Sequence, residues 1–179
     1  LRHHRGACLV PANDLLCLLE PLQPIIVPVR HGALSRASAA RFARAFASHE
    51  PLLVFPAGVT ARERGDRLRD APWRASFVTR ARLSGRDLLP VAVSGRNSRL
   101  FYAIHKLRRL LGIKLNVEMA LLVGEMFRRG GDTVVLRFLE PRAASPKRGC
   151  DRDTDLALVR DLQRDVERVA ASLGPKRRR

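Results

Sequence analysis

Short apolar runs rich in β-branched residues alternate along this chain with longer segments of helical period. This alternation is typical of strands that are connected by helices crossing a mostly parallel sheet. The fold predicted from it is a single α/β domain with a mixed, largely parallel sheet flanked by helices, followed by a C-terminal helix and a basic tail. The predicted strands cover residues 25–29, 52–55, 88–93 and 133–138.

Several segments carry apolar side chains at the three- and four-residue spacing of an amphipathic helix. One helix is expected directly after Ser35, because a serine hydroxyl suits the N-cap position. Further helices are expected over residues 98–112, 116–129 and 154–173. The last of these ends at a Gly-Pro pair, which is a common stop signal for a helix.

The composition changes after Pro141, where Pro, Ser, Arg and Gly become frequent. We therefore expect the α/β domain over residues 1–142, a linker over residues 143–153, and an amphipathic helix with a basic tail over residues 154–179. A chain of 179 residues with 46% hydrophobic residues can build one packed core, so disorder is excluded as the default state.

The chain carries 34 Lys and Arg against 17 Asp and Glu, a formal net charge of +17. Such a surplus favours a polyanionic partner, and both nucleic acid and an anionic membrane surface qualify. No apolar run reaches the roughly 18 to 20 residues that span a bilayer. The three cysteines share no CxxC spacing, which supports neither a disulfide framework nor a zinc site and makes a reducing cytoplasm the expected compartment.

The end of the second predicted strand carries residues suited to anion binding. Pro56 and Gly58 make the chain leave the sheet sharply, and residues 57–72 are expected to form a long polar loop. In open α/β sheets, ligands bind at the carboxyl ends of the strands. Arg62 or Arg64 could contact two phosphate oxygens at once, and a merely solvated loop is the alternative.

A second candidate lies where the strand over residues 88–93 leads into Gly95-Arg96-Asn97-Ser98 and then into a helix. A helix N-terminus with a serine cap and a neighbouring arginine favours an anion. Ordinary capping beside a turn glycine is the alternative.

The helix expected over residues 98–112 is both basic and amphipathic. Leu100, Phe101 and Ile104 are predicted to contact a bilayer, and Arg108 and Arg109 its anionic headgroups. The alternative is that the apolar stripe packs against the sheet.

Four blocks follow one another along the chain: FPAG at residues 55–58 with Arg62 after it, Trp73 ahead of Phe77, LPVAVSGRNS at 89–98, and EMFRRGGDTVVLRFLEPR at 125–142. In order and spacing these blocks resemble the glycerolipid (lysophospholipid) acyltransferase superfamily, in particular its bacterial haemolysin-like, ornithine-lipid-associated branch. The resemblance extends over roughly residues 11–142.

This resemblance implies transfer of a fatty acyl group from acyl-CoA or acyl-carrier protein to a lysophospholipid, glycerol-phosphate or amino-lipid acceptor. It implies no cofactor beyond that donor, no specific nucleic acid partner, and a cytoplasmic, peripheral location at the inner face of the cell membrane. The substrate-binding residues that it implies are Arg30, Phe55, Pro56, Gly58, Arg62, Arg64, Gly95, Arg96 and Asn97.

The chain also departs from the pattern of the superfamily. Ala57 stands where the third block commonly has Glu, and no histidine is followed five positions later by Asp, which is the catalytic signature. That pair removes a proton from the acceptor during its attack on the thioester. We therefore expect an N-terminally truncated sequence without a catalytic residue, inactive by itself. A non-catalytic lipid-binding module and a basic nucleic-acid-binding protein are the alternatives.

Overall fold

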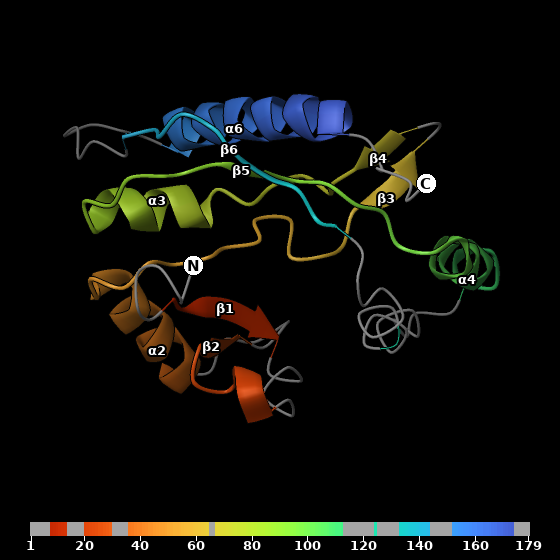
Figure 1. Ribbon diagram of the computed structural model, residues 1–179. Coiled ribbons are helices and arrows are strands. Elements are labelled where there is room, and N and C mark those ends of the chain that lie inside the picture. Colours follow the sequence, from red (N-terminus) through yellow and green to blue (C-terminus); the bar gives the residue numbers. More distant parts are fainter. Residues whose placement is uncertain are drawn as a thin grey trace. The chain divides into compact units, whose positions relative to one another are not determined.

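The computed structural model describes residues 8–13, 20–29, 36–64, 67–112, 124, 133–143 and 152–173. These residues form a mixed α/β fold, as predicted (Figure 1). The chain divides into two compact units. Unit 1 contains Leu1–Gly58, Trp73–Leu88 and Ala143–Val159, and unit 2 contains Val59–Pro72, Leu89–Arg142 and Arg160–Arg179.

The strands of unit 1 are β1 (Val10–Asn13) and β2 (Ile26–Val29), which pair in parallel with Val10 opposite Ile26. A short 3-10 helix, η2 (Glu20–Leu22), lies between them in the sequence. The prediction of a strand over residues 25–29 is thus confirmed. Strand β1 was not predicted, because Pro and Asn are poor strand formers. Of the strand predicted over residues 52–55, only a parallel bridge between Leu9 and Leu52 is present.

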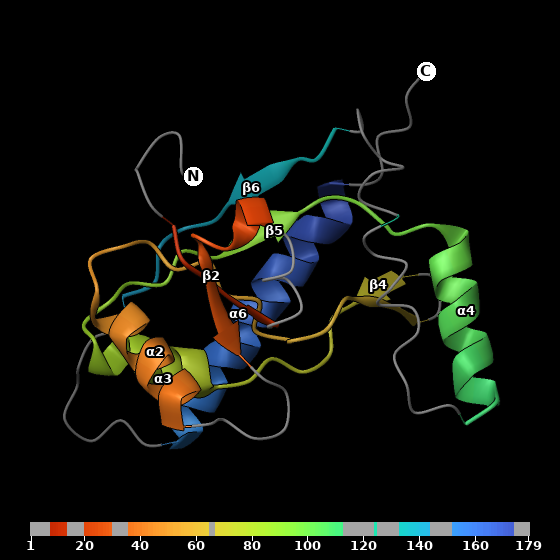
Figure 2. The ribbon, with the colours of Figure 1, turned by 90° about the horizontal axis from the view of Figure 1, so that it is seen from below.

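Two helices of unit 1 enclose its small core. Helix α2 (Arg36–Ala47) follows Ser35 as predicted, and α3 (Ser76–Leu83) lies beside it (Figure 2). Phe46 of α2 and Ala81 of α3 are buried against each other, and the partly buried side chains packed around them are Phe42, Leu52, Val54 and Leu88. This core cluster is therefore built from two helices, the chain that follows α2, and Leu88 after α3.

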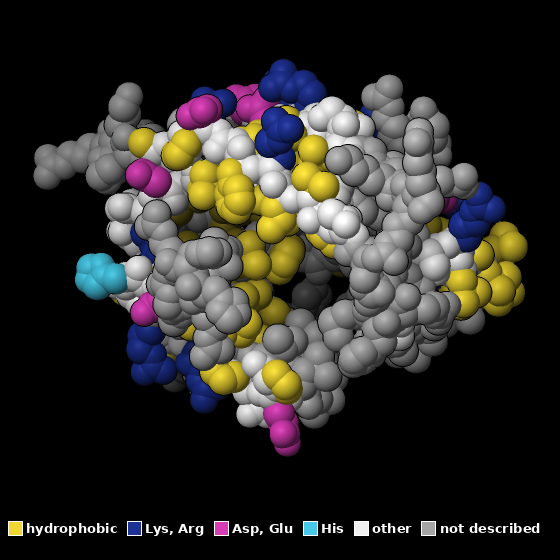
Figure 3. Space-filling view, in the orientation of Figure 1, with side chains coloured by type: hydrophobic (Ala, Val, Ile, Leu, Met, Phe, Trp, Pro, Cys, Tyr) yellow, Lys and Arg dark blue, Asp and Glu magenta, His cyan; other side chains and the backbone are white. Residues whose placement is uncertain are grey.

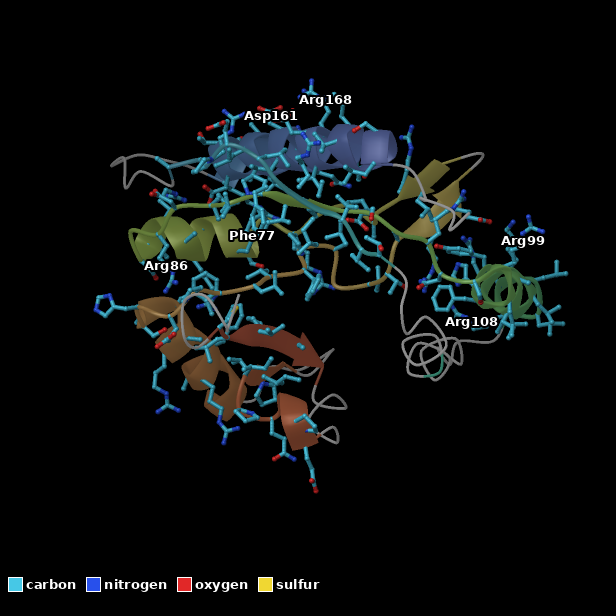
Figure 4. The ribbon with its side chains drawn as sticks, in the orientation of Figure 1. Phe77, Arg86, Arg99, Arg108, Asp161 and Arg168 are labelled. Atoms are coloured by element: carbon cyan, nitrogen blue, oxygen red, sulfur yellow. The ribbon has the colours of Figure 1, made fainter. Side chains whose placement is uncertain are left out.

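Arg86 holds the end of α2 in place. Its guanidinium donates hydrogen bonds to the carbonyl oxygens of Phe46 at 3.2 Å, Ser48 at 2.5 Å, and Glu50. The carbonyls at a helix C-terminus lack partners within the helix, and a cation also suits the negative end of the helix dipole. Figure 4 shows Arg86 extending from the α3 side toward α2.

Asp155 joins the first turns of helix α6 (Arg152–Leu173) to α3. This carboxylate is only 4% exposed. It accepts hydrogen bonds from Arg82 Nε at 3.2 Å and Nη2 at 2.7 Å, and a further one from the Thr79 hydroxyl. A buried charge is tolerated only when it is paired and hydrogen-bonded, and Asp155 meets both conditions. The helix predicted over residues 154–173 is confirmed and begins two residues earlier.

The described residues of unit 2 form two antiparallel strand pairs. Strands β3 (Arg62–Arg64) and β4 (Arg67–Arg69) pair with Arg62 opposite Arg69. Strands β5 (Val91–Val93) and β6 (Leu136–Phe138) pair with Val91 opposite Phe138. Residues 160–173 of α6 run along β5 and β6 (Figures 1 and 2), where Leu162 and Val166 are buried.

These pairings change two predictions. The prediction of a polar loop over residues 57–72 is wrong in part, because this segment contains the β3–β4 hairpin. The sequence carried a signal for it, since the Gly-Asp pair between the two strands is a known two-residue hairpin signal. The largely parallel sheet is not confirmed, since every sheet in the described residues has two strands, and only β1 and β2 are parallel. The division of the chain at residues 142 and 154 stays a prediction.

Helix α4 (Arg99–Leu110) confirms the helix predicted over residues 98–112. The Ser98 hydroxyl caps it by accepting a hydrogen bond from the Phe101 N–H at 3.1 Å, and Gly112 follows it with a φ of 65°. Phe101 is completely buried, so its predicted contact with a bilayer is wrong. The helix predicted over residues 116–129 lies outside the described residues except for residue 124, which is helical.

Tyr102 is buried next to Phe101, and the two rings meet edge to face at 5.4 Å. Burial raises the pKa of the Tyr102 phenol, because a phenolate would lose its hydration. The hydrogen bond that the Asn97 N–H donates to the phenol oxygen and the nearby Arg96 charge act in the opposite direction.

Removal of the Asp155 carboxylate should destabilise unit 1. We expect Asp155→Ala to lower the free energy of unfolding by about 3 kcal/mol, since Arg82 would lose its counter-charge in a largely enclosed place. Asp161→Ala is the matched control, because Asp161 lies on the exposed side of the same helix (Figure 4) and should cost about 0.5 kcal/mol or less. Denaturant unfolding measures both, and equal effects would contradict the structural role of Asp155.

Tyr102 is the single tyrosine, so the ultraviolet absorbance of phenolate reports on it alone. The pH midpoint of the phenolate titration should lie above the ordinary tyrosine pKa of about 10 in the folded chain. In denaturant the midpoint should return to that ordinary value. The pKa of Tyr102 is higher in the folded chain than in the unfolded chain, so the protonated phenol contributes to the stability of the fold. That contribution is complete below the unfolded pKa and is lost as the pH rises through the folded pKa. Identical midpoints in the two states would show that Tyr102 is not buried.

Candidate anion-binding site

Arg62 lies at the start of β3 with its guanidinium over the ring of Phe101, 5.1 Å from the ring centre. A cation above an aromatic face is attracted by the electrons of the ring. The guanidinium also donates a hydrogen bond to the Thr60 hydroxyl. The half-buried Arg62 side chain is therefore held in one orientation by its neighbours in unit 2.

The adjacent residue, Glu63, forms ion pairs with two cationic side chains from other parts of unit 2. One carboxylate oxygen is 3.2 Å from Arg96, which lies between β5 and α4, and the other is 3.4 Å from Lys106 on α4. We call Arg62, Glu63, Arg96 and Lys106 the Glu63 cluster. It combines three cations with one partly exposed carboxylate, so the cluster keeps a net positive charge that favours an anion.

Gly95 and Asn97 shape the chain around Arg96. Gly95 has a φ of 128°, a conformation that is rarely adopted by residues with a side chain. The N–H of Asn97 donates a hydrogen bond to the phenol oxygen of Tyr102 at 3.2 Å. The strand end is thus fixed against α4, and Arg96 is directed to Glu63.

The predicted residues Phe55, Pro56 and Gly58 belong to unit 1. They form a tight turn, in which the N–H of Gly58 donates to the carbonyl oxygen of Phe55 at 3.0 Å and Gly58 has a φ of 66°. The carbonyl oxygen of Pro56 accepts a hydrogen bond from the N–H of Arg74, so this turn is tied to the segment before α3. The exposed Phe55 side chain is left at the surface of this turn.

Unit 2 therefore brings together three of the predicted site residues, Arg62, Arg96 and Asn97, with Gly95 shaping the turn between them. The backbone of Arg64 lies in β3 beside them. Arg30 lies outside the described residues.

Sequence reasoning missed Glu63, Lys106 and Tyr102 as members of this arrangement. Glu63 lies 33 residues from Arg96, and nothing local indicates that they pair. The single Glu between two Arg at residues 62–64 was the available signal, because a carboxylate attracts nearby cations. In the fold, Arg62 lies over the Phe101 ring and Glu63 pairs with Arg96 and Lys106, and the charges of Arg62, Glu63 and Arg96 all act on the phenol of Tyr102.

Unit 1 contains two hollows that are not lined by predicted site residues. One, of about 290 Å³, lies between β2 and α2, and the other, of about 560 Å³, lies between Trp73 and the start of α6. Among the described residues, no group of three or more His, Cys, Asp or Glu side chains could hold a metal ion. No helix in the described part of the chain has the length and apolarity needed to cross a bilayer.

Comparison with known proteins identifies related sequences. A family model for acyltransferases matches residues 2–165. The lyso-glycine lipid O-acyltransferase of Phocaeicola vulgatus is 34% identical over 141 residues, which are 78% of this chain and 50% of that protein. The protein of the same name from Bacteroides thetaiotaomicron is 33% identical over 141 residues, 78% of this chain and 52% of that protein. No solved structure matches the chain.

The chain thus spans about half the length of the curated relatives it matches. The match covers residues 2–165 and confirms the resemblance carried by the four sequence blocks. By this match, which extends over most of its sequence, the chain belongs to the acyltransferase family.

Proposed function

We propose that this chain provides the acceptor-binding part of a lipid acyltransferase. The acceptor is a lyso-lipid with a free hydroxyl and an anionic headgroup, and the donor is an acyl thioester of coenzyme A or acyl-carrier protein. The observation that carries the proposal is the Glu63 cluster, placed within the region that the acyltransferase model matches. The names of the relatives, which act on a lyso-glycine lipid, support this class of acceptor.

The Glu63 cluster would bind the headgroup of the acceptor. Arg62 and Arg96 each present a planar guanidinium, which matches the two oxygens of a carboxylate or the oxygens of a phosphate. Arg62 is already oriented by the ring of Phe101, so binding would cost little side-chain entropy. Glu63 is the partner of Arg96 and Lys106 in the absence of substrate, and the anionic headgroup would replace it.

The remaining predicted residues have a supporting role in this proposal. Phe55, Pro56 and Gly58 form a tight, partly exposed turn in which the backbone of Gly58 is open to close approach by a substrate. Arg30 and Arg64 stay candidates for contacts with phosphate. The predicted largely parallel sheet also stays a proposal, supported by the parallel pairing of β1 and β2.

In the reaction, the hydroxyl oxygen of the acceptor attacks the carbonyl carbon of the thioester, the carbon–sulfur bond breaks, and the thiol leaves. The hydroxyl proton must pass to a base and finally to the departing sulfur. No histidine of these 179 residues has the aspartate five positions later that would orient it. The role of this chain is therefore to bind and orient the acceptor, and proton transfer is assigned to none of its residues.

A lipid acceptor also supports a peripheral location at the inner face of the cell membrane, where both the lipid and a cytoplasmic acyl donor are accessible. The net charge of +17 favours an anionic surface of this kind.

The first test concerns catalysis. The 179 residues should bind a lyso-lipid acceptor but release no thiol from acyl-CoA or acyl-carrier protein, because a His-x-x-x-x-Asp pair is missing. A gene product that carries such a pair ahead of this sequence should release thiol with the same acceptor. Rapid turnover by the 179 residues would refute the assignment of proton transfer, and failure to bind any lyso-lipid would refute the proposed function.

The second test concerns the Glu63 cluster. Arg62→Ala should weaken binding of a soluble short-chain acceptor with a carboxylate or phosphate headgroup by about 1.5 to 3 kcal/mol, the range for a hydrogen bond to a charged group. Glu63→Gln should strengthen the same binding, because it frees Arg96 and Lys106 from their competing carboxylate. Calorimetry measures both affinities.

The matched control for that test is Arg164→Ala, which removes an exposed arginine paired with Asp161 on α6. It should leave the affinity unchanged, since it lowers the net charge by the same amount as Arg62→Ala without touching the cluster. If Arg62→Ala and Glu63→Gln also bind the acceptor like the parent chain, the headgroup is bound elsewhere.

A further inference from the structure

Helix α4 carries apolar side chains on two opposite faces. One face holds Phe101 and Tyr102, which are buried in unit 2. The other holds Leu100, Ala103, Leu107 and Leu110, which follow one another at spacings of three and four and therefore form one stripe. We call these four residues and the adjacent Leu111 the leucine face. All five are exposed to solvent.

The exposure of the leucine face is large for such side chains. Leu107 is 55% exposed and Leu110 is 84% exposed, and Leu100 and Leu111 are also open. Single exposed leucines are common on proteins, but a contiguous apolar strip indicates an interaction surface. Figure 3 shows hydrophobic side chains gathered over α4 at the right edge of the view.

Two exposed basic side chains border the leucine face. Arg99 and Lys106 lie three or four residues from Ala103 and Leu110 on the same helix, and none of the residues of α4 is acidic. In Figure 4, Arg99 and Arg108 lie on different sides of the helix. An apolar stripe bordered by Lys and Arg is typical of helices that lie in the plane of an anionic membrane surface.

We propose that α4 is the element that docks this protein on an anionic bilayer, with the leucine face inserted among the acyl chains and Arg99 and Lys106 at the lipid headgroups. This inference rests on the proposed function for its lipid partner. It differs from the sequence-based expectation in the residues that touch the membrane, because Phe101 faces the interior and holds the helix to the protein.

The basic side chains beside the leucine face favour an anionic bilayer over other binding partners. Each Lys or Arg near an anionic surface adds to the attraction, whereas a second copy of this strongly basic chain would bring its own cations next to these. The Glu63 cluster touches the same helix through Lys106, so docking through α4 would bring the candidate headgroup site close to the lipid surface.

The test is sedimentation of the 179-residue chain with vesicles of phosphatidylcholine alone or mixed with phosphatidylglycerol. The parent chain should bind the anionic vesicles more tightly. Leu107→Ser/Leu110→Ser should weaken that binding about tenfold or more, because two apolar side chains no longer enter the bilayer. Arg99→Gln should weaken binding to anionic vesicles and leave binding to neutral ones unchanged.

The matched control is Leu83→Ser, which replaces a leucine that is 78% exposed on α3. It should bind vesicles like the parent chain. The leucines that are changed contribute little to the core, and circular dichroism verifies the folding of each variant. Equal binding by the parent chain and Leu107→Ser/Leu110→Ser, or equal binding to neutral and anionic vesicles, would overturn the proposal.

Two further readouts separate the possible outcomes. Leu107→Ser/Leu110→Ser could change the oligomeric state in light scattering while vesicle binding stays the same. In that case the leucine face binds a second copy of the chain, and the membrane proposal is wrong. Acceptor binding by the parent chain is measured separately, with the soluble short-chain acceptor and without vesicles. Absence of acceptor binding with intact vesicle binding refutes only the proposed function, and the reverse result refutes only the docking proposal.

Discussion

The buried ring of Phe101 is the contact on which the features of unit 2 depend. It has no exposed surface, it meets Tyr102 edge to face, and it supports the guanidinium of Arg62 on its own face. Because this ring orients α4, it also determines which helix face is turned outward. The arginine that we place in the headgroup site and the leucines that we place in the bilayer are thus positioned by one aromatic side chain.

Two carboxylates of this chain have opposite roles, and their exposure explains the difference. Asp155 is enclosed, and its bonds to Arg82 and Thr79 join α6 to α3. Glu63 is partly open to water, and its contacts with Arg96 and Lys106 are longer. Water and salt weaken such exposed pairs, so an incoming anion can compete for the cations. A buried pair serves structure, whereas an exposed pair within a basic cluster can be exchanged for a substrate.

The chain belongs to the acyltransferase family, and the lipid-binding roles that we propose for it need no catalytic residue in this chain. The curated relatives are about twice as long as the segment that they share with it. Binding a lipid headgroup and approaching a bilayer require only cations and apolar surface, and unit 2 contains both. Proton transfer requires a positioned base, for which the sequence offers no His and Asp at the required spacing.

The sequence alone determined the features that depend on neighbours along the chain. The Ser98 cap, the helical spacing of α4 and α6, and the β-branched centres of β2 and β5 are local signals, and the structure confirms them. The family was also readable, because it depends on the order of short blocks. Tertiary structure alone decided the antiparallel pairing of β5 with β6 and the meeting of Glu63 with Arg96, which lie far apart in sequence. It also decided which apolar face of α4 is buried: both faces have helical spacing, and only the fit of Phe101 beneath Arg62 distinguishes the interior face from the exposed one.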